Sequence, residues 1–169
     1  MSATMWARLL SPFLLVALAA GCGRPAVPDS SKSAVLGKPM PSIDRRALDG
    51  RKVDPASYAG KTVVVKFFAE YCEPCKRTLP EAEALSRARA DVVVIGVSED
   101  EREDVARGIV EGYGLSFPVV HDRGQVLSGR FRVSSLPASF VVDPQGIVRW
   151  VGFGARSQGM EQAVEAIAP

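Results

Sequence analysis

The sequence predicts an α/β fold in which a mixed β-sheet is flanked by helices. Through the middle of the chain, short apolar runs typical of buried strands alternate with stretches of helical periodicity. Near the C-terminus two apolar runs follow each other around a turn, and a last helical stretch closes the chain. The alternation predicts parallel strands joined by helices, and the late hairpin adds antiparallel strands, so the sheet is expected to be mixed.

The first half of the folded region is expected to contain a hairpin, a strand, a helix and a second strand. Asp49-Gly50 lies between two short extended stretches and is a hairpin signal. Leu79, Ala82 and Leu85 recur at three-residue steps, as on the apolar face of a helix. The expected elements are a hairpin within 42–54, a strand over 61–68, a helix over 73–89 and a strand over 92–97.

The second half is expected to begin with a helix that ends near Glu111. Ser98 is the predicted N-cap of that helix, with Glu101 at the capping-box position. Asp143 to Gly146 reads as the turn of the late hairpin. The expected elements are this helix, a strand over 117–122, a short helix over 125–131, two strands within 138–153 and a closing helix over 157–168.

Composition indicates one domain of ordinary size plus a tail. The chain has 169 residues, is 47% hydrophobic and carries 21 basic against 19 acidic side chains. It contains no basic stripe or run of like charges, so nucleic acid is a poor candidate partner. Three cysteines are too few for a disulfide-stapled scaffold.

The N-terminus reads as an export signal. One basic residue precedes an apolar stretch of about 12 residues, whereas a membrane span needs roughly 20. The stretch ends in LAAGC, which resembles a bacterial lipoprotein box with Cys22 as the lipidated residue, although Ala19 stands where Leu is usual. A plain cleaved signal and an uncleaved anchor are the alternatives. The expected organisation is a lipoprotein signal peptide over 1–21, a flexible Pro- and Ser-rich tether over 22–34 and a folded domain over 35–169.

The stretch CEPC places Cys72 at the predicted strand-to-helix junction and Cys75 within the first helical turn. A helix N-terminus presents unpaired N–H groups and a partial positive charge, so it favours a thiolate at Cys72. Cys75 is expected on the shielded inner side of the turn. An exposed thiolate that attacks a disulfide, followed by a second thiol that resolves the mixed disulfide, is the chemistry this asymmetry suits. Pro74 is tolerated in the first turn because its missing N–H is not needed there.

A close cysteine pair has two other possible uses, a structural zinc site and a structural disulfide. A structural zinc site needs four ligands, and beyond Cys22 the chain offers two cysteines and one histidine, so zinc would require a dimer. A purely structural disulfide across two residues constrains very little chain. A redox couple is therefore the favoured interpretation.

The residues VVVKFFAEYCEPCKRTLP (63–80) resemble the thioredoxin superfamily, in its TlpA/ResA-like branch of exported thiol–disulfide oxidoreductases. Further stretches similar to that branch are 36–61, 113–122 and 133–154. The resemblance implies a thioredoxin fold with an N-terminal β-hairpin extension and an inserted βα element. CEPC, with Glu73 and Pro74 as its spacer, is similar to the motif of the ResA-type reductants of cytochrome c maturation.

The resemblance also implies further site residues and partners. Pro137 corresponds to the family's cis-proline, and with Leu136 it would align an extended substrate strand near the cysteines; a trans-proline at a strand start is the alternative. The expected activity is reduction of disulfides in exported proteins in the cell envelope. Electrons would come from a CcdA/DsbD-type membrane carrier. No prosthetic group is implied, and a monomer is the default.

Three departures from the family pattern concern the surroundings of the cysteines. Tyr71 stands where Trp commonly precedes the first cysteine, and Thr78 stands where ResA-like reductants carry Glu. Lys66 occupies the place of a buried Asp found in many thioredoxins. A protonated Lys66 near the pair would favour a Cys72 thiolate, whereas a side chain that snorkels to the sheet edge would have no such effect.

Two alternative functions use the same cysteines. A copper chaperone would bind the metal through Cys72, Cys75 and His121, although copper proteins of this fold separate their cysteines by three residues. A thiol peroxidase would carry Thr or Ser three residues before its reactive cysteine, where this chain has Ala69.

Overall fold

A computed structural model describes residues 24–169. The expected signal peptide over 1–21 and the expected lipidation residue Cys22 lie outside the described residues. No helix within residues 24–169 is both long and apolar enough to cross a membrane.

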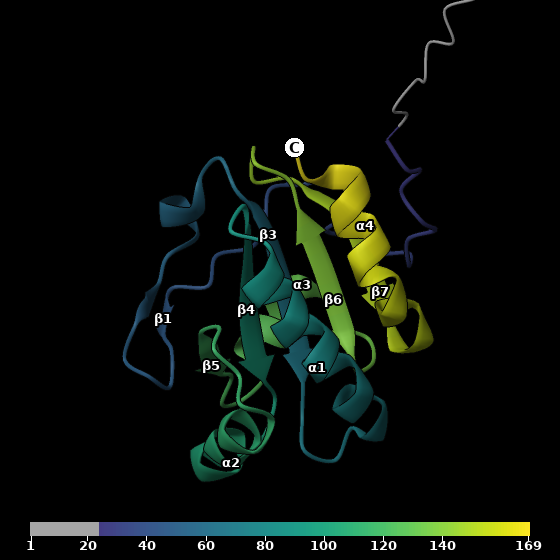
Figure 1. Cartoon of the computed structure of the whole chain (residues 1–169). Helices are drawn as coiled ribbons and strands as arrows, with labels where there is room; N and C mark the ends of the chain where they lie inside the picture. The colour runs from purple at the N-terminus through teal and green to yellow at the C-terminus, as the bar shows by residue number, and fades with distance from the viewer. Residues whose placement is uncertain (1–23) are drawn as a thin grey trace, which may run out of the picture.

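The described chain folds around a five-stranded mixed sheet with the strand order β5-β4-β3-β6-β7 (Figure 1). The central strand β3 runs parallel to β4 and antiparallel to β6, and the pairs β4–β5 and β6–β7 extend the sheet at its two sides. A separate antiparallel pair, β1–β2, forms the N-terminal hairpin. The strands are β1 (Arg45–Arg46), β2 (Lys52–Val53), β3 (Thr62–Phe68), β4 (Val92–Ser98), β5 (Val119–His121), β6 (Ala138–Val142) and β7 (Val148–Phe153).

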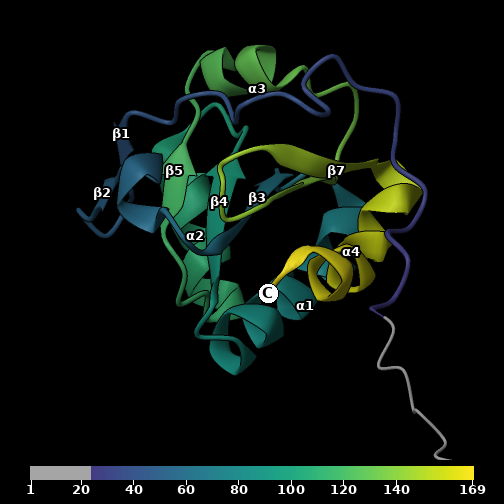
Figure 2. The same cartoon turned by 90° about the horizontal axis from the view of Figure 1, so that it is seen from above.

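Helices cover both faces of this sheet, as the view from above makes clear (Figure 2). Helices α1 and α4 lie on one face, and the short helix α3 lies on the other together with the segment that precedes β1 (Figures 1 and 2). The helices are α1 (Glu73–Ala88), α2 (Glu103–Tyr113), α3 (Val126–Phe131) and α4 (Met160–Ile167), with the 3-10 turns η1 (Pro55–Tyr58) and η2 (Gly154–Gly159). The fold is the predicted thioredoxin-type α/β architecture with an N-terminal hairpin.

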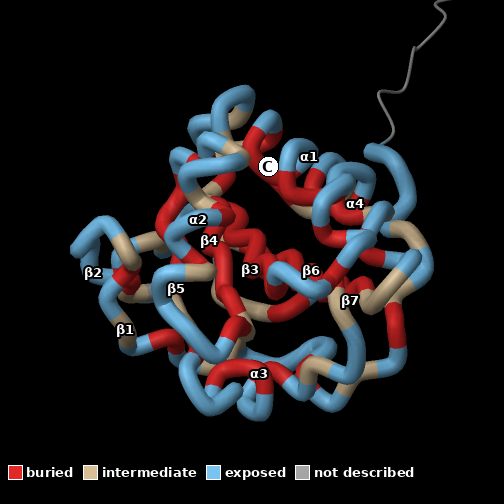
Figure 3. The backbone as a smooth tube through the Cα atoms, turned by 90° about the horizontal axis from the view of Figure 1, so that it is seen from below, coloured by how far each residue is buried: buried red, intermediate tan, exposed pale blue. Residues whose placement is uncertain are grey.

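Strand alternation divides the interior into two cores, one on each side of the sheet. The central strands β3, β4 and β6 between them are buried along nearly their whole length (Figure 3). Val64 and Phe68 of β3 pack in the core beneath α1, which also holds Cys72 and Cys75. Odd-numbered residues of β3 pack in the other core, beneath α3 and the segment before β1; they are Val63, Val65 and Phe67.

The start of α2 differs from the prediction. Ser98 is the last residue of β4, and its hydroxyl donates to the Asp100 carboxylate (2.7 Å) rather than capping a helix. The helix begins at Glu103, and the Arg102 N-cap makes no side-chain hydrogen bond to it. The loop is longer than predicted because Asp100 is held by groups at the carboxyl end of the sheet. The other predicted strands and helices are present with shifted ends.

The N-terminal strap, residues 28–39, lies along the outer edge of β7 and extends the fold ahead of the predicted domain start at Val35. Ser31 N–H donates to Val151 O (2.6 Å), and Phe153 N–H donates to Ser31 Oγ (3.1 Å). Further along, Gly37 N–H donates to Val148 O (2.8 Å). An edge strand has unpaired backbone groups, and these contacts satisfy part of that edge. Composition alone could not reveal this docking, because it depends on a strand more than one hundred residues away.

Candidate active site

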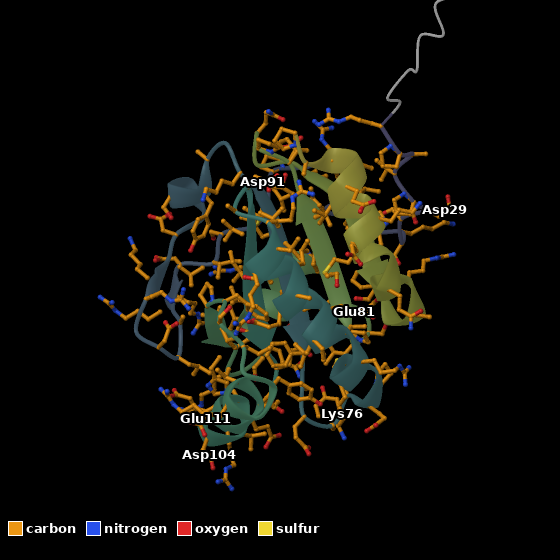
Figure 4. The ribbon with its side chains drawn as sticks, viewed as in Figure 1. Asp29, Lys76, Glu81, Asp91, Asp104 and Glu111 are labelled. Atoms are coloured by element: carbon orange, nitrogen blue, oxygen red, sulfur yellow. A yellow bond between two sulfur atoms is a disulfide. The ribbon has the colours of Figure 1, made fainter. Side chains whose placement is uncertain are left out.

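The two cysteines lie between β3 and α1, at the end of the sheet where the parallel strands β3 and β4 end. In Figure 4, Lys76 marks this end of the molecule, and Asp91, which precedes β4, marks the opposite end. Cys72 is the N-cap residue of α1 and Cys75 lies in its first turn, where the Cys75 N–H donates to Cys72 O (2.9 Å). The two sulfur atoms form a disulfide, with the Cα atoms 5.3 Å apart. The pairing and the helix start agree with the prediction.

Cys72 and Cys75 differ in their surroundings. Cys72 is 5% exposed and faces an open cleft of about 590 Å³, whereas Cys75 is 1% exposed and turns to a smaller, largely apolar hollow between α1 and α2. A protein disulfide approaching along the cleft would therefore meet Cys72 first. The cleft is lined by Tyr71, Cys72, Glu73, Pro74, Glu99, Gln125, Val133, Ser134, Ser135 and Leu136.

The loop before β6 forms the wall of the cleft opposite α1. The Leu136–Pro137 peptide bond is cis, as the resemblance implied. Leu136 lines the same cleft as Cys72, while Pro137 is buried and its carbonyl accepts the Gly154 N–H (2.9 Å). The structure thus brings the cysteine pair and the Leu136–Pro137 loop, far apart in sequence, to one site.

A buried carboxylate, Asp100, holds the loop that leads into Cys72. Its Oδ1 accepts the Glu70 N–H (2.9 Å), and its Oδ2 accepts the Ser98 hydroxyl (2.7 Å). One residue earlier, the Glu99 N–H donates to Phe68 O (2.9 Å). These bonds tie the end of β3 to the end of β4 and position the backbone just ahead of the redox pair.

Glu99 is a cleft residue that the sequence analysis missed. It is half-buried, and the Ser128 hydroxyl donates to its Oε1 (2.7 Å). Burial raises the pKa of Glu99, the Ser128 hydrogen bond partly opposes that change, and nearby Asp122 and Asp100 raise it further. Its position directly after β4 could have indicated a place in the cleft, because groups at the carboxyl ends of parallel strands meet at one edge of a sheet.

Lys66 lies on the same face of β3 as Val64 and Phe68, under α1, and is completely buried. Its Nζ lies 3.0 Å from Ser139 Oγ and 3.0 Å from Ser157 Oγ. Burial lowers the pKa of Lys66 to about 7, and Glu81 offsets only part of that change. The snorkelling alternative is wrong for this side chain, because it ends on two buried hydroxyls rather than in solvent.

Of the remaining predicted residues, Tyr71 and Glu73 are exposed beside Cys72, and Thr78 is buried behind Cys75. Tyr71 is 69% exposed; its partial burial raises its pKa, and Glu99 and Asp100 add to that effect. Glu73 pairs with Lys76 (2.7 Å), and the hydrogen bond from that ammonium lowers the pKa of Glu73. Thr78 is buried, and its hydroxyl donates to Cys75 O (3.3 Å), so no carboxylate stands at that place.

His121 lies apart from the cysteines. It lines a different hollow of about 450 Å³, together with arginines of the β1–β2 hairpin and α2. Its Nε2 lies 2.7 Å from Asp100 O. Within residues 24–169 no three His, Cys, Asp or Glu side chains are grouped so that they could hold a metal ion. The geometry does not assemble the site that a copper chaperone using Cys72, Cys75 and His121 would need.

Comparisons with known proteins agree with this geometry. The family model described as the AhpC/TSA family matches residues 36–151. The thiol–disulfide oxidoreductase ResA of Bacillus anthracis is 33% identical over 115 residues, which are 67% of this chain and 66% of that protein. ResA of Bacillus cereus is 30% identical over 138 residues, 79% of each chain. The thioredoxin domain of a thiol–disulfide oxidoreductase from Bacteroides vulgatus superposes with a TM-score of 0.70 at 23% identity, over 83% of this chain and 100% of that one, and supports the fold.

Proposed function

We propose that this chain, which belongs to the AhpC/TSA family and to the ResA-type thiol–disulfide oxidoreductases, reduces disulfides in exported proteins. The observation that carries this proposal is the Cys72–Cys75 disulfide at the N-terminus of α1, with only Cys72 facing the open cleft. Such a pair can hold two electrons and pass them to another disulfide.

Cys72 is the nucleophile in this proposal. In the reduced protein, the free N–H groups of the first turn of α1 favour its thiolate. The thiolate attacks one sulfur of the substrate disulfide, a mixed disulfide forms, and the other substrate sulfur leaves as a thiolate. Cys75 then gives up its proton and attacks Cys72 Sγ, so the second substrate thiolate leaves and the Cys72–Cys75 disulfide returns. A dithiol donor must reduce that disulfide before the next turnover.

The cleft residues would bind the substrate chain around its cysteine. Leu136 and the three residues before it line the wall opposite α1 and can lie beside an extended segment. Pro137, which follows Leu136 in this wall, is proposed to help align that segment. Tyr71, exposed at the rim, offers an aromatic surface to an apolar residue next to the substrate cysteine.

The proposed location is the cell envelope, with Cys22 as a lipid anchor and residues 1–21 as its signal. The described chain begins at the end of the molecule opposite Lys76 (Figures 1 and 4). Exported compartments are oxidising, so a reductant needs electrons from across the membrane, and a CcdA/DsbD-type carrier is the proposed donor. An exported apocytochrome c is a candidate substrate, because the CEPC motif resembles that of the ResA-type reductants of cytochrome c maturation.

Trapping tests the assignment of the two cysteines. In Cys75→Ala the mixed disulfide on Cys72 cannot be resolved, so the variant should accumulate covalent adducts with exported proteins that disappear on reduction. Cys72→Ala is the matched control and should trap none. Absence of adducts in Cys75→Ala, or equal capture by both variants, would contradict the proposed mechanism.

A peroxide assay separates this proposal from a thiol peroxidase. Ala69 offers no hydroxyl near the cysteine pair, so the reduced protein should consume hydrogen peroxide far more slowly than it reduces a protein disulfide such as insulin. Comparable rates for the two substrates would favour the peroxidase.

A further inference from the structure

A buried amine and two buried hydroxyls form a closed triangle beneath α1. Lys66 Nζ lies 3.0 Å from both Ser139 Oγ and Ser157 Oγ, and the two serine oxygens lie 2.6 Å apart. All three side chains are at most 1% exposed, and within residues 24–169 these three are the only hydrogen bonds that their side-chain polar atoms make. Three contacts must therefore accommodate every hydrogen that these groups carry.

Counting the hydrogens favours the neutral amine. An ammonium has three donors and no acceptor, and each hydroxyl has one donor. If Lys66 is charged, it donates to both serines, one serine donates to the other, and two hydrogens are left without an acceptor. If Lys66 is neutral, one N–H donates to the first serine, that serine donates to the second, and the second donates to the amine lone pair. This ring leaves only one N–H unused.

The electrostatic surroundings point the same way. The neighbouring strands β4 and β6 contribute no ionisable side chain, and the charged residues of η2 and α4, which are Arg156, Glu161 and Glu165, are exposed. On α1, exposed Glu81 alone raises the pKa of Lys66, and burial outweighs it. No carboxylate lies within ion-pair distance of Lys66 among the described residues, so nothing compensates a buried ammonium in the disulfide state.

Reduction of the disulfide changes this balance. The core that contains Val64 and Phe68, the neighbours of Lys66 on its face of β3, also contains Cys72 and Cys75. A thiolate at Cys72 would place a negative charge at this core, where charges are weakly screened. An ammonium at Lys66 then gains a counter-charge that it lacks in the oxidised protein.

We propose that Lys66 is a neutral amine while Cys72 and Cys75 are disulfide-bonded, and that it takes up a proton when the disulfide is reduced. A protein dithiol that reduces the pair gives up two electrons and two protons and becomes a disulfide. One proton goes to Cys75 Sγ and the other to Lys66 Nζ, while Cys72 stays a thiolate. When a substrate disulfide is later reduced, Cys75 and Lys66 release these two protons to the substrate thiolates. This inference rests on the proposed use of Cys72 as a thiolate.

Lysine NMR of the full chain in both redox states tests the inference. The chain has six lysines, and Lys66 is the only one that is buried. With ¹³C-labelled lysine side chains, the Lys66 signal should titrate with at least tenfold higher proton affinity in the reduced protein than in the oxidised protein. Lys76, next to Cys75, should also sense the new charge, whereas the signals of Lys32, Lys38, Lys52 and Lys61 should be unaffected by redox state. Lys66→Met identifies the signal, and Lys61→Met, at an exposed residue just before β3, is the matched control.

A reciprocal measurement separates this role from a purely structural one. Binding free energies of two coupled protons are linked, so Lys66→Met should weaken the acidity of the Cys72 thiol by the same factor, and Lys61→Met should not. Equal Lys66 affinity in the two redox states would overturn the inference. That result would leave the proposed function intact, because trapping by Cys75→Ala does not depend on Lys66. If Lys66→Met fails to fold, the titrations of Lys66 in the oxidised and the reduced unmodified chain still test the inference.

Discussion

The two faces of β3 differ in chemistry although they belong to one seven-residue strand. On the face toward α3, Val63, Val65 and Phe67 enter a core of apolar side chains, where Phe67, Phe131 and Phe140 pack with ring centroids 5.1–5.6 Å apart. On the face toward α1, Val64 and Phe68 flank a buried lysine, and the same core holds both cysteines.

This difference separates stability from chemistry. The cluster of phenylalanine rings gains from burial and shape alone, and it needs no particular protonation state. The face toward α1 keeps Lys66, Thr78, Ser139 and Ser157 buried at a desolvation cost. The buried polar groups toward α1 lie in the layer of the redox pair, whereas the buried Asp122 on the side of α3 accepts the Leu127 and Ser128 N–H groups and holds the start of that helix.

The largest expected effect contrasts one residue from each face. Phe131→Ala should lower the free energy of unfolding by about 3–5 kcal/mol, because it opens a cavity among packed rings. The rate of disulfide exchange per folded molecule should remain unchanged. Urea unfolding and insulin reduction, normalised to the folded fraction, measure the two quantities.

Leu79→Ala is the counterpart on the other face. It should cost about 2–5 kcal/mol and also slow exchange per folded molecule, because Leu79 packs in the core of Cys75 and lines the hollow beside it. Equal exchange rates for the Phe131 and Leu79 variants, once corrected for folding, would remove the functional distinction between the faces.

The next effect is a pH dependence that belongs to the face toward α1. The pKa of Lys66 is about 7 in the folded protein and about 10.5 in the unfolded chain. Between these values the unfolded chain binds more protons, so stability rises with pH, by at most about 1.4 kcal/mol per pH unit. The contribution is lowest below pH 7, where the buried amine must carry its charge. Urea unfolding of the oxidised protein from pH 6 to 9 should show this rise, and the rise should be absent in Lys66→Met.

Lys61→Met provides the control for that measurement, because Lys61 is exposed and should keep the wild-type pH slope. An unchanged slope in Lys66→Met would mean that Lys66 binds its proton equally in the folded and unfolded chains. The protonation of Lys66 would then affect the free energy of unfolding no more than that of a surface lysine. The contrast between the two faces of β3 would lose its electrostatic basis.

The smallest effect lies at the sheet edge, away from both faces. Ser31→Ala removes the acceptor for the Phe153 N–H and should cost about 0.5–1.5 kcal/mol without changing exchange. Ser33→Ala is a matched control, since its hydroxyl accepts only a local 3.4 Å bond from Val35. A loss of exchange activity in Ser31→Ala would tie the N-terminal strap to the active site instead of to stability.

Much of the fold was predictable because its signals are local. Apolar runs, helical periodicity and turn residues give the order of elements, and the CEPC motif after an apolar run locates the redox pair. The cis peptide at Pro137 was predictable only through the resemblance, because no local pattern distinguishes it. The cap at Ser98 was predicted wrongly because a serine at a strand end can serve either a helix or, as here, a neighbouring carboxylate.

The residues that escaped prediction are those defined by distant neighbours. Glu99 becomes a cleft residue because β4 ends beside β3. Ser157 becomes a partner of Lys66 because η2 folds back under α1. The strap binds β7 because that strand is the edge of the sheet. Each depends on contacts between segments far apart in the chain.

By itself, the sequence determined which sulfur atoms can pair and which of them begins a helix, because both follow from a spacing of three residues and a strand-to-helix junction. Only the tertiary structure decided that Lys66 ends on two hydroxyls out of reach of water. A lysine in an apolar run can extend to the solvent or stay inside. The choice depends on whether strands and turns from elsewhere in the chain close over it and supply hydrogen-bond partners.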